Sequence, residues 1–218
     1  MQIYEGKEQI ANLPRPNTSR PAYFVGLDLG QSQDFSAIAV MERHGTSKDN
    51  YVFHCRHLER WKLRTPYPAI VADTVRMMNS PQMQSGRTRP MLAVDATGVG
   101  APVIDLLKRE RMKATLKPIQ IIGGANVSSE FGMTRVPKRD LVSTVQVYLQ
   151  NGRLKIAEQL PEAETLTREL QNFQVKINDN AHDTYGAWRE GTHDDLILAA
   201  SLALWAGTEI TQAQFYSM

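Results

Sequence analysis

The chain has 218 residues, which is enough for one substantial hydrophobic core and short for two. Charged residues make up 22% and hydrophobic residues 42%, an ordinary balance for a soluble globular domain. The net charge of +2 neither requires nor excludes a nucleic-acid partner. Cys55 is the only cysteine, which excludes an internal disulfide and fits a reducing cytoplasm. There is no signal pattern and no apolar run of membrane-spanning length, so a cytoplasmic protein without a membrane partner is expected.

Residues 1–21 are predicted to form a flexible arm, because Pro14, Pro16 and Pro21 interrupt any periodicity. Three strand-like runs follow, separated by Gly-rich and polar turns; they cover residues 22–29, 36–43 and 51–58. Their close spacing predicts an antiparallel meander. Residues 68–79 have apolar positions at helical spacing, and residues 80–90 are predicted to be a polar loop.

From residue 91 onward, strands and helices alternate. Strands are predicted at 91–96, 116–122 and 153–157, helices at 101–111, 137–150, 161–173 and 192–208, a loop at 123–135, and a hairpin pairing 174–178 with 184–188. The last helix is apolar on most faces and therefore buried. The fold class is α/β, with a mixed sheet in which three antiparallel strands are followed by alternating strands and helices. One domain over 22–210 and a tail at 211–218 are expected.

Acidic residues mark three of these elements. Asp28 and Asp95 each end an apolar strand, and Asp194 and Asp195 open the apolar last helix. Carboxylates at the ends of buried elements can converge on one point, where hard oxygen ligands favour Mg²⁺ or Mn²⁺. Two such ions can hold and activate a phosphodiester for in-line attack. The pattern therefore suggests a two-metal nuclease.

Each acidic motif also has a structural interpretation. Asp28 could equally cap a turn, and Asp34 is interpreted as a turn residue or as indirect support for the site rather than a metal ligand. Gly98 and Gly100 after Asp95 permit a tight turn, but a Rossmann nucleotide site would need a third glycine. No nucleophile elbow and no P-loop is present in the sequence.

The start of the last helix is predicted in more detail. Thr192 as N-cap with Asp195 at the third helical position would form a capping-box-like pair. This explains Asp195 as a cap and leaves Asp194, about 100° around the helix, as the metal ligand. His193 could orient a water or a phosphate, or could lie on the surface.

Basic residues gather in two groups. The first comprises Lys108, Arg109, Arg111, Lys113 and Lys117, and fits a solvated face and a DNA-facing patch equally well. The second, Lys138 and Arg139, follows the 123–135 loop, and with Arg135 it could form a positive DNA-facing edge. The alternative is a solvent loop whose Phe131 packs into the core. His54 and His57 on one strand would point to opposite faces, which argues against a zinc site.

The ordered set of motifs resembles a known family. The set is Gly-Leu-Asp28-Leu-Gly, then Val-Asp95-Ala-Thr-Gly-Val-Gly, then Pro-Lys138-Arg-Asp-Leu-Val, then His-Asp194-Asp195-Leu. It is similar to the nuclease domain of the large terminase subunit of tailed bacteriophages, over residues 22–208. The resemblance implies an RNase H-like fold and two Mg²⁺ or Mn²⁺ ions held by the four aspartates, with Asp28, Asp95 and Asp194 catalytic.

The resemblance also implies a substrate and partners. The substrate would be concatemeric double-stranded viral DNA, cut during genome packaging in the host cytoplasm, with Lys138, Arg139 and Arg135 on its backbone. A packaging ATPase domain or subunit, the portal and the small terminase subunit would be partners. This chain carries no ATPase motif, so we expect an excised domain, with the Pro-rich arm as a cut linker, or a separate polypeptide.

Three other functions are alternatives to a terminase nuclease. A Holliday-junction resolvase would share the fold and carboxylates but prefer branched DNA. A sugar-kinase-like phosphotransferase needs two such subdomains, and this chain is too short. A catalytically silent RNase H-like nucleic-acid-binding module would not need three separate acidic motifs.

Overall fold

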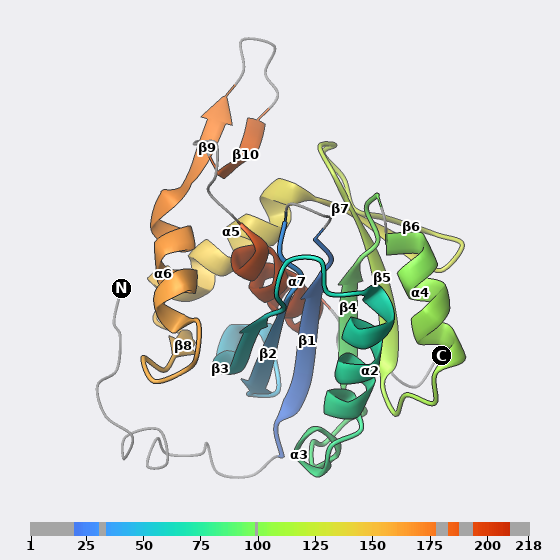
Figure 1. Cartoon of the computed structure of the whole chain (residues 1–218). Helices are drawn as coiled ribbons and strands as arrows, with labels where there is room; N and C mark the ends of the chain where they lie inside the picture. Colours follow the sequence, from blue (N-terminus) through green and yellow to red (C-terminus); the bar gives the residue numbers. More distant parts are fainter. Residues whose placement is uncertain (1–19, 31–33, 99, 178–182, 188–193, 210–218) are drawn as a thin grey trace.

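The computed structural model describes residues 20–30, 34–98, 100–177, 183–187 and 194–209. A central sheet carries helices on both faces (Figure 1). Helices α2 (Tyr67–Met78), α3 (Pro81–Gln84) and α4 (Gly100–Arg109) pack on one face. Helices α5 (Lys138–Gln150), α6 (Ala163–Asn172) and α7 (Asp195–Glu209) cover the other. A short 3₁₀ turn, η1 (Lys48–Asn50), precedes the third strand.

The sheet has eight strands in the order β6-β7-β5-β4-β1-β2-β3-β8. The strands are β1 (Ala22–Asp28), β2 (Ala37–His44), β3 (Val52–Arg60), β4 (Met91–Asp95), β5 (Thr115–Ile122), β6 (Ser128–Glu130), β7 (Met133–Pro137) and β8 (Leu154–Ile156). β1, β2 and β3 pair antiparallel, which confirms the predicted meander, while β4, β5 and β7 run parallel to β1. The predicted mixed α/β sheet is confirmed. A separate hairpin, β9 (Phe173–Ile177) with β10 (Asp183–Ala187), confirms the pairing predicted there.

Helix α7 is the most deeply buried helix among the described residues, with every residue from Asp195 to Gly207 buried. It packs directly on β1, and Gly26 permits this approach: a Cβ there would lie 1.9 Å from the Ala199 carbonyl oxygen. The other end of α7 meets the buried Arg43, whose guanidinium donates to the Gly207 carbonyl and lies over the rings of Phe24 and Tyr51. A cation at a helix C-terminus is favourable for the helix dipole.

The segment 123–135, predicted to be a loop, contains the hairpin β6–β7, so that prediction was wrong. Glu130 pairs with Met133, and the two residues between them, Phe131 and Gly132, have φ of 50° and 77°. Two left-handed residues are typical of a tight hairpin turn, which Asn-Gly or Gly-Gly usually signals. Phe131 gives no such signal, and β6 has only 3 residues, all exposed.

Two predicted helix starts differ from the structure, and the predicted domain limits lie mostly outside the described residues. The last helix begins at Asp195 rather than near Thr192, and Pro137 precedes α5 rather than starting it. The predicted arm and tail, 1–21 and 211–218, lie almost entirely outside the described residues, so these domain limits stay predictions. In the described parts of the chain, no helix is long and apolar enough to cross a membrane.

Replacing Gly26 with alanine should destabilise the protein by about 1–3 kcal/mol or more, because the added methyl group meets backbone on α7 rather than a movable side chain. Chemical unfolding followed by circular dichroism measures the change. Gly123→Ala is the matched control, since its Cβ would meet nothing within 4 Å. Equal stability of the two variants would contradict this account of the α7–β1 contact.

Candidate metal centre

Two of the predicted aspartates end neighbouring parallel strands. Leu27 of β1 pairs with Val94 of β4, so Asp28 and Asp95 follow at the same edge of the sheet. Asp28 is buried and Asp95 half-buried. The Asp95 carboxylate accepts a 2.8 Å hydrogen bond from the Thr97 backbone N–H. The turn after β4 therefore fixes the orientation of the Asp95 side chain.

The second acidic pair arrives at this edge from α7. The Leu198 N–H donates to the Asp194 carbonyl at 3.0 Å, so Asp194 occupies the N-cap position and Asp195 is the first helical residue. Asp195 is 4% exposed, whereas the Asp194 side chain is 26% exposed. The sequence predicted Asp195 as the third helical residue, with Thr192 as the N-cap. That position was wrong, because the helix begins at Asp195 itself. Thr192 and His193 lie outside the described residues.

Helix α5 supplies a cation to the same place. The Lys138 ammonium lies 3.1 Å from Asp194 Oδ2, joining the first residue of α5 to the residue before α7. Burial raises the pKa of Asp28 and of Asp95, and the positive charge of Lys138 opposes part of each rise. The structure thus brings together Asp28, Asp95, Asp194, Asp195 and Lys138, from four elements separated in sequence.

Burial raises the pKa of Asp28, Asp95 and Asp195, so these three carboxyl groups resist ionisation. Burial, and after it the charge of Asp95, raises the pKa of Asp28 well above its usual range. Burial and the adjacent Asp194 raise the pKa of Asp195 to about 7, with Arg60 opposing the shift. Asp34, which is exposed, also contributes to that rise, consistent with an indirect influence. The edge therefore concentrates negative charge that only cations can stabilise.

A further carboxyl, Glu169 of α6, was not predicted. It is 7% exposed, and its Oε2 accepts a 2.8 Å hydrogen bond from the Ile197 N–H in the first turn of α7. Burial, then Asp195, raise its pKa to about 8. The sequence carried one signal for Glu169: it lies on the same face of α6 as Ala163 and Leu166. A carboxyl on such an apolar face is buried at a cost in free energy, which suggests that it has a role.

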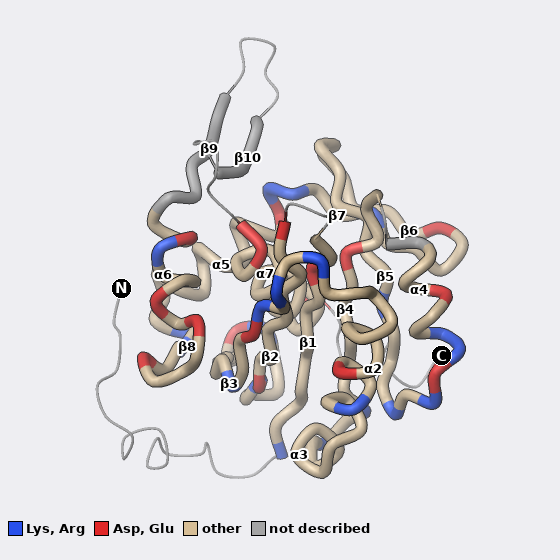
Figure 2. Tube along the Cα trace, in the orientation of Figure 1, with Lys and Arg blue, Asp and Glu red and all other residues tan. Residues whose placement is uncertain are grey.

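The basic residues divide between the two ends of the sheet. Arg139 donates to the Ala125 carbonyl at 2.8 Å, and Arg135 lies 3.1 Å from Gln120 and 3.7 Å from Glu130, so both flank Lys138 on the β5–β7 side. The group from Lys108 to Lys117 lies where α4 ends and β5 begins, at the end of the sheet away from the aspartates. Figure 2 shows these blue segments separately.

A basic loop that sequence reasoning missed also lies at the aspartate edge. β3 ends at Arg60 opposite Ala37, which in turn pairs with Asp28, so the following residues Lys62 and Arg64 emerge at the same edge of the sheet as Asp28. The Tyr67 hydroxyl anchors this connection by donating to the Gly30 carbonyl at 3.0 Å. Figure 2 shows blue segments on the connection between β3 and α2.

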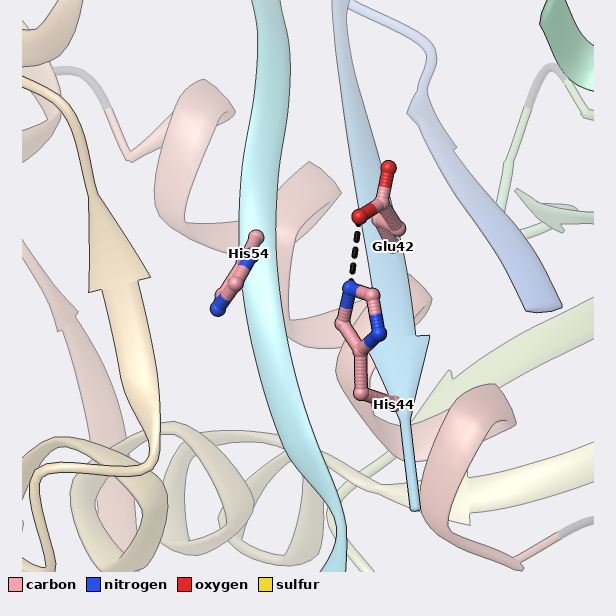
Figure 3. A group of neighbouring side chains, drawn as sticks. All are labelled: Glu42, His44 and His54. Carbon is pink, nitrogen blue, oxygen red and sulfur yellow. Dashed lines mark hydrogen bonds and ion pairs between the residues drawn. The ribbon is translucent and has the colours of Figure 1, made fainter. Parts of the chain in front are cut away.

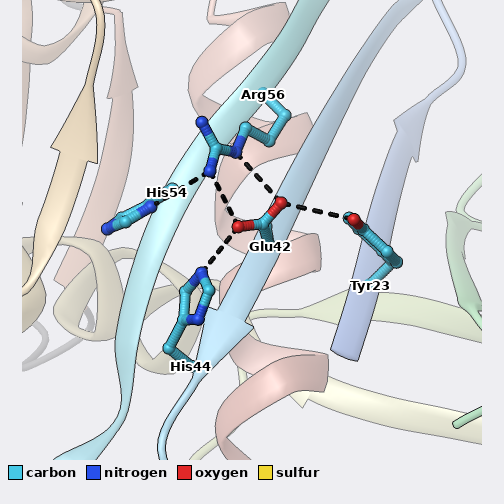
Figure 4. Close-up of polar contacts among 5 residues, drawn as sticks. All are labelled: Tyr23, Glu42, His44, His54 and Arg56. Carbon is cyan, nitrogen blue, oxygen red and sulfur yellow. Dashed lines mark hydrogen bonds and ion pairs between the residues drawn. The ribbon is translucent and has the colours of Figure 1, made fainter. Parts of the chain in front are cut away.

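A second group of possible metal donors lies at the other end of the sheet. Glu42, His44 and His54 have donor atoms within 4.8 Å of one another (Figure 3). Arg56, however, pairs with both Glu42 oxygens, at 2.8 and 3.1 Å, and lies 3.4 Å from His54 Nδ1 (Figure 4). Because a guanidinium already supplies the positive charge, this cluster is an ion-pair network rather than a metal centre.

The same strand corrects a prediction about its histidines. A β-bulge between Val40 and Met41 shifts the register, so that His54 pairs with Glu42 and His57 with Val40. Residues two apart on β2 share a face, so both histidines lie on one face rather than on opposite ones. They still do not form a site, because His57 pairs with Glu59 at 3.0 Å.

Comparison with known proteins identifies the family. The model of the Terminase RNaseH-like domain family matches residues 25–206, and the chain belongs to this family. The family predicted from the motifs is therefore confirmed. The comparison with curated protein sequences gave no match.

Solved terminase nuclease structures share the fold. The large terminase nuclease from thermophilic phage G20c is 21% identical, with 87% of this chain and 82% of that one covered and a TM-score of 0.60. The g2p (large terminase) nuclease domain of bacteriophage SPP1 is 15% identical, with 94% and 96% covered and a TM-score of 0.55. The human cytomegalovirus terminase nuclease domain is 14% identical, with 99% and 94% covered and a TM-score of 0.60. The predicted RNase H-like fold is confirmed.

In EDTA, the free energy of unfolding should fall as pH rises from about 4 to about 8. The pKa of Glu169 rises from 4.5 to about 8 and that of Asp195 from 3.8 to about 7 on folding. The folded protein therefore holds protons that the unfolded chain releases, and this contribution is lost as pH rises through the folded-state values. Thermal unfolding across this range measures the slope. Glu169→Gln should flatten it, whereas Glu164→Gln, exposed on the same helix, should not.

Proposed function

We propose that the protein is a metal-dependent endonuclease that cuts double-stranded DNA by two-metal hydrolysis of the phosphodiester. The observation that carries this proposal is the convergence of Asp28, Asp95, Asp194 and Asp195 on one edge, where burial raises the pKa of Asp28, Asp95 and Asp195. Repulsion by neighbouring carboxylates adds to the rise for Asp28 and Asp195. Membership of the Terminase RNaseH-like domain family supports it. The arrangement costs stability, so a role beyond folding is expected.

The donor set fits Mg²⁺ or Mn²⁺. The four aspartates offer hard oxygen ligands, and among the described residues no cysteine or histidine accompanies them at this edge. Similar nuclease structures are described with bound magnesium, cobalt and Mn. When bound, two such ions would supply charge neutralisation of the phosphate and a water acidic enough to attack it.

The side chains at this edge would have different roles in holding the ions and the phosphate. Asp28 lies on the central strand and is coupled electrostatically to Asp95, Asp194 and Asp195, so it is suited to bridge two ions. Asp95, oriented by Thr97, would hold one side and the α7 pair the other. Lys138, which pairs with Asp194 at 3.1 Å, would place a positive charge beside the bound phosphate. From the sequence, Asp194 was expected to be the metal ligand and Asp195 a helix cap. We propose instead that both can bind an ion, because the buried Asp195 is as suited to ligation as Asp194.

The DNA backbone would lie along the aspartate edge. Lys138, Arg139 and Arg135 flank the centre on the β5–β7 side, and Lys62 and Arg64 on the β3 side. Contacts of this kind are to phosphate and do not select sequence, so cleavage should be largely indifferent to sequence.

Genome packaging is the proposed setting. The chain aligns with 41% of a longer solved structure, the large terminase from a thermophilic bacteriophage, which suggests that it works with a packaging ATPase domain or subunit. The substrate would be concatemeric viral DNA in the host cytoplasm, with the portal and small terminase subunit as further partners. A resolvase-like activity on branched DNA and a silent binding module are the alternatives that the experiments below separate.

Nicking of supercoiled plasmid should require Mg²⁺ or Mn²⁺ and stop in EDTA. Asp28→Asn should abolish nicking while leaving the fold intact, and in the absence of metal it should raise the melting temperature because it removes a buried ionisable group. Asp105→Asn, an exposed aspartate on α4, is the matched control and should cut normally. Robust cutting in EDTA would refute metal dependence, exclusive cutting of four-way junctions would favour the resolvase, and DNA binding without cutting would favour the silent module.

The double variant Lys138→Ala with Arg139→Ala should bind DNA more weakly and with a flatter salt dependence. Losing two phosphate contacts should reduce the slope of log K against log salt by about 2. Lys108→Ala with Arg109→Ala, at the other end of the sheet, controls for the loss of two positive charges. Fluorescence anisotropy with labelled duplex over a salt series gives the slopes. If the control pair changes the slope and the test pair does not, the DNA lies at the opposite end.

A further inference from the structure

Phe131 is the most exposed large apolar side chain in the described part of the protein. Its relative exposure is 105%, against 44–47% for Leu63, Val127 and Val147. It sits at the tip of the β6–β7 hairpin and contributes nothing to either hydrophobic cluster. The alternative considered from the sequence, that Phe131 packs into the core, was therefore wrong.

The backbone at this position also disfavours a bulky residue. Phe131 has a φ of 50°, in the left-handed region, where Gly and Asn are favoured and an aromatic residue is strained. Gly132 follows with a φ of 77°, as a two-residue turn requires. Neither burial nor turn geometry explains a phenylalanine here, so the explanation must lie in something that the hairpin contacts.

The hairpin is directly connected to the candidate metal centre. Lys138, whose ammonium pairs with Asp194, comes seven positions after Phe131. A fully extended chain of that length spans at most about 25 Å. At about 3.4 Å per base pair, this is no more than about seven base pairs of duplex. Phe131 is thus within reach of a duplex whose scissile phosphate lies at the aspartates.

The surroundings of Phe131 fit DNA better than a protein surface. Protein interfaces bury about 800 Å² on each partner around an apolar core. Here one ring stands beside polar residues: Ser128 and Ser129 are exposed, and Glu130 pairs with Arg135 at 3.7 Å. Val127, half exposed, is its only large apolar companion on this connection among the described residues. A single apolar wedge near cations is how many proteins enter the minor groove.

We infer that Phe131 is a DNA-positioning residue, whose ring packs into the minor groove within about seven base pairs of the cut. This inference rests on the proposed nuclease function. The ring would give apolar contact with sugars and base edges, which Arg135 and Arg139 on the phosphates cannot provide. It would thereby fix the register of the duplex on the metal centre without reading sequence.

Phe131→Ala should weaken binding of long duplex about tenfold, within the range known for aromatic contacts with bases, and should reduce cutting in parallel. Phe131→Asn should show the same loss while the hairpin becomes at least as stable, because Asn suits the left-handed turn. Val147→Ala, exposed on α5, is the matched control. Retained affinity and cutting in both Phe131 variants would overturn the inference.

Phe131→Trp gives a direct readout. Its added indole fluorescence should be quenched by duplexes that extend at least about seven base pairs on the hairpin side of the cut, and less by shorter ones. Quenching that is independent of duplex length would place the ring elsewhere on the complex. Quenching that follows protein concentration without DNA would place the ring against a second copy of the chain. Either result would overturn the inference. If the unaltered protein itself neither binds nor cuts DNA, the proposed function fails first, which is distinguishable from failure of Phe131 alone.

Discussion

The contact between Gly26 of β1 and Ala199 of α7 sets the geometry on which the candidate centre depends. Asp28 lies two strand residues beyond Gly26, about 6.6 Å, and Asp195 lies one helical turn before Ala199, about 6 Å. Since the helix runs antiparallel to the strand, these two offsets bring both carboxyls to the same level. A larger residue at position 26 would push the helix out and separate the carboxyls as well as loosening the core.

This construction works against the stability of the protein. Burial raises the pKa of Asp28, Asp195 and Glu169, so each carboxyl costs free energy when it ionises in the folded state. Lys138 and Arg60 offset only part of that cost. A rigid helix with its dipole directed at the edge, covered by α5 and α6, keeps the carboxyls together despite the repulsion. Cations that bind there would stabilise the folded protein by mass action.

The sequence predicted the parts of this arrangement that follow from local pattern. Asp28 and Asp95 end continuous apolar strands, and a helix as apolar as α7 can only be buried, so their elements and edge were predictable. Glu169 was not, because its meeting with Ile197 depends on how α6 packs on α7. Lys62 and Arg64 were missed because only the strand pairing brings their loop to the same edge of the sheet as Asp28. The bulge in β3 was missed because it carries no Gly to mark it, and the hairpin turn was missed because Phe131, the first turn residue, stands where Asn or Gly is usual.

Buried carboxylates at the two ends of the sheet have opposite pKa shifts, because their charged neighbours differ. Glu42 is buried, yet Arg56, His44 and the Tyr23 hydroxyl surround it, and its pKa falls to about 2 (Figure 4). Its charge is balanced by protein, so it stabilises the fold and has no need of an ion. At the other end, Lys138 pairs with Asp194 and its charge opposes only part of the rise in the pKa of Asp28 and of Asp95, so the pKa of Asp28 rises instead of falling. Evolution toward stability alone would replace such a group with apolar residues or match it with arginines. This unbalanced set of carboxyls, on the central strand, is the physical basis for the proposal that this end of the sheet receives cations and, with them, a phosphodiester.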